Sequence, residues 1–203
     1  MRKLDSATDS RRTVQKHIFS LISEGNAVVS ERELAGRFSL TRSNVREILL
    51  GLEGEGVLER LPKRGYRGVN YRNADRPAAD SIRYAIEHEG ARLAVQNLQN
   101  GDLARLRAVL MRMERHLADG ELEAFGQDDR DFHRLLVSFS RDPLVTHQFN
   151  ILCDTIFLVR RISEFKSEVA QISHRAIYEA LSRRDWPALE AALKEHIGKG
   201  VCL

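Results

Sequence analysis

The sequence predicts a mainly α-helical protein in which an N-terminal winged helix-turn-helix is followed by an all-α bundle of six helices. Three observations support this fold class. Apolar residues recur every three or four positions along most of the chain. A helix-capping motif begins at residue 30 and a short turn comes after it, and a basic hairpin pattern covers residues 56–69. After residue 78 no alternating strand pattern occurs.

Composition and charge narrow the possible classes of protein. The chain has 203 residues, enough for two domains, and only two cysteines, too few for a disulfide scaffold or a four-thiolate zinc site. No run of eighteen apolar residues and no apolar leader occur, so we expect a cytoplasmic protein with no membrane partner. Residues 1–75 carry 14 Lys and Arg against 10 Asp and Glu, whereas residues 76–203 carry 18 against 19. This weak basic excess points to a polyanion partner for the front of the chain.

A polar stretch without apolar periodicity, residues 70–77, is the best candidate for a domain boundary. We therefore predict a winged helix-turn-helix domain over residues 1–72, a linker over 73–77 and an all-helical domain over 78–203.

The first domain begins with an amphipathic helix that ends near Gly25. Ser30 and Glu33 form a capping box, which predicts that a second helix starts at Ser30. Thr41 is the expected N-cap of a third helix, whose apolar face is formed by Val45, Ile48, Leu49 and Leu52. Two short strands, 56–61 and 66–69, then read as a hairpin with a basic turn. This order of elements is typical of a winged helix-turn-helix.

The polar face of the third helix suits the major groove of DNA, because the first turn of a recognition helix meets phosphates and base edges. Arg42 and Arg46 are the candidates for reading bases, since arginine can bind guanine through two donors. Arg32, Lys63 and Arg64 are better suited to phosphates. The alternative is an ordinary solvated helix face, but the agreement of caps, turn and hairpin favours DNA binding.

The stretch SERELAGRFSLTRSNVREILLGLEGEGVLERLPKRGYRGV, residues 30–69, resembles the DNA-binding head of GntR-type transcription regulators. The resemblance implies double-stranded DNA contacts at Arg32, Thr41, Arg42, Ser43, Asn44, Arg46, Arg64 and Gly65. Two positions depart from the family pattern. Val29 replaces the usual proline, and Asn44 stands where proline or threonine is common, so the operator that is read can differ.

In the second domain we predict helices over about 78–98, 102–118, 121–139, 143–162, 166–183 and 186–199. Asp129 and His133 are four residues apart and share one helix face, where a carboxylate oxygen and an imidazole nitrogen can meet one cation. His174 and His196 border apolar stripes of later helices. Spacing alone leaves open whether these histidines bind a metal or are packed structural residues.

Residues 78–203 resemble the FCD-type ligand-binding domain of the FadR branch of the GntR family, in the segments IRYAIEHEGARLA, DRDFHRLL and SHRAIYEALSRRDWPALEAALKEHI. The resemblance implies a divalent metal held by Asp129, His133, His174 and His196. One carboxylate and three imidazoles suit zinc or nickel. The coordination positions that such an ion leaves open favour a small carboxylate effector, which Arg83 and Arg160 or Arg161 could bind through paired donors. Of these arginines, Arg83 matches a residue often found in the pocket of the family.

Together these features predict a regulator that binds a pseudo-palindromic operator as a homodimer and responds to a small carboxylate at the metal site, as a repressor or an activator. Two alternatives remain. The Asp and His set could serve a metalloenzyme, although no His-Glu-x-x-His helix, nucleophile elbow or phosphate-binding glycine loop is present. The metal could instead be purely structural in a DNA-binding protein that senses nothing.

Overall fold

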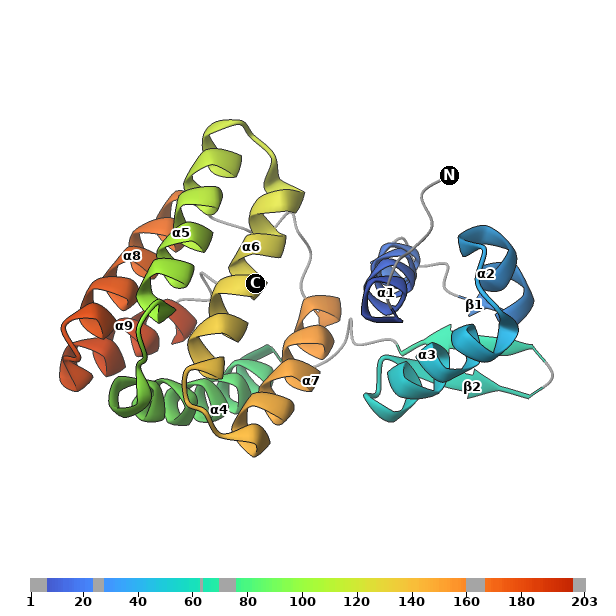
Figure 1. The fold of residues 1–203 in the computed structure, drawn as a ribbon, viewed down its shortest axis with the longest axis horizontal. Coiled ribbons are helices and arrows are strands. Elements are labelled where there is room, and N and C mark those ends of the chain that lie inside the picture. Colours follow the sequence, from blue (N-terminus) through green and yellow to red (C-terminus); the bar gives the residue numbers. More distant parts are fainter. Residues whose placement is uncertain (1–6, 24–27, 63, 70–75, 160–166, 199–203) are drawn as a thin grey trace. The chain divides into compact units, whose positions relative to one another are not determined.

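The computed structural model describes residues 7–23, 28–62, 64–69, 76–159 and 167–198. The chain divides into two compact units, Met1–Asn73 and Ala74–Leu203. The described residues are mainly helical in both units (Figure 1), as the sequence predicts. No helix among these described ranges is both long and apolar enough to cross a membrane.

The first unit contains three helices and a small sheet, namely α1 (Ala7–Ser23), β1 (Val28–Val29), α2 (Glu31–Phe38), α3 (Arg42–Gly54), β2 (Leu58–Leu61) and β3 (Gly65–Gly68). The predicted helix caps are confirmed. Ser30 Oγ accepts a hydrogen bond from the Glu33 amide, and Thr41 Oγ1 accepts one from the Asn44 amide, each at 3.2 Å. Ser39 ends α2 in the left-handed conformation with φ 55°, which turns the chain towards α3.

The sheet has three strands in the order β1-β3-β2, all antiparallel. The sequence predicted only the hairpin of β2 and β3, because a strand of two residues, Val28 and Val29, leaves no periodicity to recognise. Val29 pairs with Tyr66, and its side chain is buried. The extra strand β1 therefore connects the start of α2 to the hairpin of β2 and β3, which is the wing of the winged helix-turn-helix.

At Gly65 the backbone of the hairpin lies close to the backbone of Val29 in β1. Its φ is +94°, and a Cβ at this position would lie 2.3 Å from the backbone oxygen of Val29. A side chain is therefore excluded both by conformation and by space.

We expect Gly65→Ala to destabilise the wing by about 1–3 kcal/mol, since it forces a non-glycine residue into this region. Urea unfolding of the chain measures the change. Gly36→Ala is the matched control, because the Cβ that it would add meets no atom within 4 Å beyond its neighbours in the chain and its own helix backbone. Equal stabilities for the two variants would contradict the close approach as the reason for Gly65.

The second unit consists of α4 (Arg76–Asn97), α5 (Asp102–Ala118), α6 (Leu122–Ser138), α7 (Pro143–Val159), α8 (Ser167–Ser182) and α9 (Trp186–Gly198). These bounds match the predicted helices within three residues. The predicted stretches around residues 160–166 lie outside the described part of the chain. Figure 1 shows α5 and α6 side by side, as are α8 and α9.

The core of the second unit lies between α4, α5, α6, α8 and α9. Phe125, Phe132 and Leu136 of α6 are fully buried against apolar residues of the other helices. The same helix carries Asp129 and His133, which are also fully buried. Polar side chains at the centre of such a core need partners.

Candidate functional site

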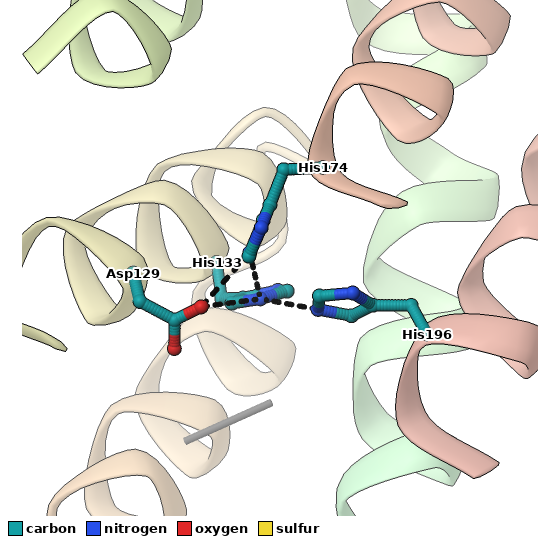
Figure 2. A group of neighbouring side chains, drawn as sticks. All are labelled: Asp129, His133, His174 and His196. Carbon is teal, nitrogen blue, oxygen red and sulfur yellow. Dashed lines mark hydrogen bonds and ion pairs between the residues drawn. The ribbon is translucent and has the colours of Figure 1, made fainter. Parts of the chain in front are cut away.

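Four predicted metal ligands meet inside the second unit. Asp129 and His133 lie one turn apart on α6, His174 lies on α8 and His196 on α9, and Figure 2 shows their side chains pointing to a common centre. Each residue offers one ligand atom, and these four atoms lie within 4.8 Å of one another. All four residues are buried with no exposed surface. The structure thus brings together residues separated by up to 67 positions in the chain.

The spacing of the four ligand atoms fits a divalent ion. His133 Nε2 lies 3.1 Å from His174 Nε2 and 2.9 Å from His196 Nε2. Asp129 Oδ1 lies 2.9 Å from His174 Nε2 and 3.8 Å from His133 Nε2. Zinc ligands at their usual distance from the ion lie about 3.3 Å apart in a tetrahedron. The donor set, one carboxylate oxygen and three imidazole nitrogens, also matches the preference of zinc and nickel.

Two residues that the sequence pattern does not predict as part of the site contact the outer nitrogens of these histidines. Glu87 of α4 meets His133 Nδ1, and Ser173 Oγ lies 2.7 Å from His196 Nδ1. Glu87 is fully buried. The available signals were weak: Glu87 follows Arg83 by four residues on α4, and Ser173 directly precedes a predicted ligand.

Arg83, the predicted effector contact on α4, is almost completely buried, with 1% of its side chain exposed. Its Nε donates to Glu87 Oε2 at 3.0 Å. Its charge also lowers the pKa of Asp129, so the guanidinium lies within electrostatic reach of the cluster. The other predicted effector residues, Arg160 and Arg161, lie outside the described residues.

Burial and neighbouring charges set the protonation of the cluster. Burial alone would raise the pKa of Asp129, but its hydrogen bond with His174 and the charges of His174, His133 and Arg83 lower it to about 2. Burial, more than any neighbouring charge, lowers the pKa of His133 below its usual value of 6.5. At neutral pH Asp129 is therefore ionised and His133 is neutral, which are the forms that bind a metal.

The lowered pKa of His133 predicts that acid destabilises the metal-free second unit. The unfolded chain binds a proton at His133 near pH 6.5, whereas the folded chain resists it, so stability falls as the pH decreases through this range. Urea unfolding in the presence of a chelator at pH 7.5 and pH 5 measures the decrease. The decrease should be smaller in His133→Gln; an equal decrease in both proteins would contradict this origin.

Several predicted DNA contacts surround a groove of about 510 Å³ in the first unit. It is formed by the start of α2, the first residue of α3 and the hairpin, and its lining includes Arg32, Arg42, Arg64 and Gly65. Arg60 and Tyr66 also line it, although the sequence pattern predicts no role for either residue. Lys63 lies outside the described residues. The groove is thus rich in arginine on both sides.

The other predicted contacts lie at the exposed N-terminal turns of α3. Thr41, Ser43, Asn44 and Arg46 are all exposed, and the side chains of Thr41 and Asn44 contact each other. Arg46 forms a two-pronged ion pair with Glu31 of α2, with Nε to Oε1 at 2.8 Å and Nη2 to Oε2 at 3.0 Å. This hydrogen bond also lowers the pKa of Glu31.

Comparisons with known proteins match both units. The family model described as FCD domain matches residues 81–199. The HTH-type transcriptional repressor RspR of Escherichia coli K12 is 27% identical over 189 residues, which cover 92% of this chain and 83% of that protein. The HTH-type transcriptional regulator LutR of Bacillus subtilis is 28% identical over 196 residues, covering 85% and 89%. Among solved structures, E. coli McbR/YncC superimposes with a TM-score of 0.80 at 20% identity, covering 95% of each chain.

The fold is that of a two-domain transcription regulator. It joins a winged helix-turn-helix to a helical domain in which side chains that can bind a metal are buried together. The chain belongs to the GntR family of these regulators, in the branch that carries an FCD domain. Its relatives are regulators and not enzymes, so the metalloenzyme alternative is rejected. Members of this family bind DNA, and the resemblance seen in the sequence is confirmed.

Proposed function

We propose that this regulator represses transcription from a pseudo-palindromic operator, bound by two copies of the chain, and senses a small carboxylate metabolite at a zinc or nickel site in its helical domain. The observation that carries the sensing half is the buried convergence of Asp129, His133, His174 and His196. A core position filled by four metal-binding side chains is difficult to explain by packing alone.

In the first unit, Arg42 and Arg46 would read the bases. The phosphates would be bound by Arg32, Lys63 and Arg64. Thr41, Ser43, Asn44 and Gly65 would contact the DNA backbone at the start of the recognition helix and at the wing. The arginine-lined groove supports this division, because it joins the start of α3 to the hairpin in one positively charged surface.

In the second unit, Asp129 and the three histidines would hold the metal, and Arg83 would bind the effector carboxylate, together with Arg160 or Arg161. The metal would supply a positive charge to an effector oxygen. Arg83 supports this assignment through its burial and through its charge, which acts on Asp129. A guanidinium offers the paired donors that a carboxylate needs.

The effector would change operator affinity only through its different affinity for two arrangements of the DNA-binding heads. Couplings of this kind are typically about 1–3 kcal/mol, which corresponds to about 5- to 150-fold in DNA affinity. A pseudo-palindromic operator would place the two heads on successive turns of the same groove.

The test begins with selection of a DNA site from a random library, followed by titration of that site with the zinc-loaded and nickel-loaded protein in the presence of a panel of small mono-, di- and hydroxycarboxylates. We expect at least one acid to change operator affinity by 5-fold or more. If metal is bound but no acid changes the affinity, the sensing half of the proposal is wrong.

A chelator distinguishes sensing from a purely structural metal. The sensing proposal expects metal removal to abolish the effector response while circular dichroism shows an intact helical fold. Wholesale unfolding after metal removal would favour the structural alternative, a DNA-binding protein that senses no ligand.

A further inference from the structure

We propose that Glu87 is a positioning residue of the metal centre: its carboxylate fixes the orientation and the tautomer of His133, so that Nε2 of this histidine presents its lone pair to the ion. The inference rests on the proposed metal site and deepens it. Neither spacing nor resemblance assigned a role to Glu87, which reaches the cluster from a different helix.

The two carboxylate oxygens of Glu87 have different partners. Oε1 meets His133 Nδ1, and Oε2 accepts the hydrogen bond from Arg83 Nε at 3.0 Å. All three side chains are buried, with exposures of 1% or less. Water therefore does not compete for either oxygen, and the orientation of the carboxylate is set from both sides.

This arrangement determines which nitrogen of His133 carries the hydrogen. A carboxylate facing a guanidinium is an acceptor only, so His133 Nδ1 must be the donor. A neutral imidazole has one N–H, and Nε2 is therefore left with a lone pair. Nε2 is the atom that lies 3.1 Å from His174 Nε2 and 2.9 Å from His196 Nε2. Without Glu87 the other tautomer would place a hydrogen atom where the ion binds.

The packing of α4 on α6 explains how Glu87 reaches His133. Gly90 lies three residues after Glu87, and Val137 lies four residues after His133. A Cβ on Gly90 would lie only 2.9 Å from Val137 Cγ1, so the two helices approach closely at this point. The two pairs occupy neighbouring turns of the same helix contact. The missing side chain of Gly90 thus permits the short reach of Glu87.

A buried ion pair that only joins α4 to α6 would be the competing explanation. It predicts that substitution of Glu87 lowers stability but leaves the zinc affinity of the folded protein unchanged. A positioning role predicts a loss of zinc affinity in protein that is still folded, because the outer partner of a metal-binding histidine typically contributes about 10- to 100-fold to affinity.

The experiment compares the full-length chain with Glu87→Ala and Glu87→Gln, using zinc alone and a competing chelator of known affinity at pH 7.5. We expect zinc affinity to fall about 10- to 100-fold in Glu87→Ala. Glu87→Gln should fall less, since its amide oxygen can still accept from Nδ1, and it serves as the test variant if Glu87→Ala does not fold. Glu190→Gln is the matched control, because Glu190 lies 2.8 Å from His88 Nε2 at the protein surface, outside the cluster.

A second measurement does not need the metal. Nitrogen-15 NMR of the chelated protein reports which ring nitrogen of His133 is protonated, and we expect the Nδ1–H tautomer in the parent chain and a mixture in Glu87→Ala. A parent chain that takes up no zinc would overturn the proposed metal site and this inference with it. Zinc binding by the parent with unchanged affinity in folded Glu87 variants would overturn the role of Glu87 alone.

Discussion

Replacing His133 by alanine is expected to abolish metal binding. His133 Nε2 lies within 3.1 Å of both other imidazole nitrogens of the cluster, so it stands at the centre of the ligand set. Loss of a direct ligand should reduce affinity by more than the roughly 10- to 100-fold expected for an outer partner. Elemental analysis after dialysis should show about one metal ion per parent chain and background levels in the variant, because the four ligand atoms meet at one centre.

His147→Ala is the control for this experiment, because His147 is an exposed residue of α7 and belongs to no ligand cluster among the described residues. Circular dichroism of both variants verifies that the helices remain folded. An unchanged metal content in His133→Ala would show that His133 is not a ligand of the metal.

Replacing Arg46 by alanine is expected to weaken binding to the selected operator about 10- to 100-fold and to relax the base preference at one position. The reason is that Arg46 is exposed near the start of α3, the proposed recognition helix, and that an arginine can make a two-pronged contact with guanine. Binding to the operator and to an unrelated duplex, each measured at several salt concentrations, gives the specificity ratio and the salt slope.

Arg64→Ala is the matched comparison, because Arg64 lies at the hairpin and is assigned to a phosphate. It should weaken the two duplexes equally and reduce the salt slope by about one unit. A loss of specificity in Arg64→Ala, with none in Arg46→Ala, would reverse the roles assigned to the two arginines.

Local signals predicted most of the fold. Ser30 and Thr41 mark helix starts because a hydroxyl that accepts a backbone hydrogen bond acts within three residues of its own position. Apolar periodicity predicted the helices of the second unit, because this pattern is also set by residues only three or four positions apart. The strand at Val28 and Val29 was missed because two residues form a strand only through pairing with a distant segment.

The candidate site was only partly accessible from sequence. Asp129 and His133 could be paired by their spacing on one helix, but His174 and His196 lie on other helices and were joined to them through the family resemblance. Glu87 could not be found, because a glutamate four residues after an arginine usually indicates a surface ion pair. Only the crossing of α4 and α6, close at Gly90, makes it a neighbour of His133.

The ion pair between Arg46 and Glu31 has a consequence for target search. The guanidinium of Arg46 is already paired with the carboxylate of Glu31 when no DNA is bound. If Arg46 reads a base, as proposed, DNA would first have to displace the Glu31 carboxylate, and a single phosphate, which is also an anion, would gain little by this exchange. A guanine edge, which matches the guanidinium fork with two acceptors, competes better. Glu31 would thereby filter random sequences, so its removal should strengthen binding to unrelated DNA more than binding to the operator.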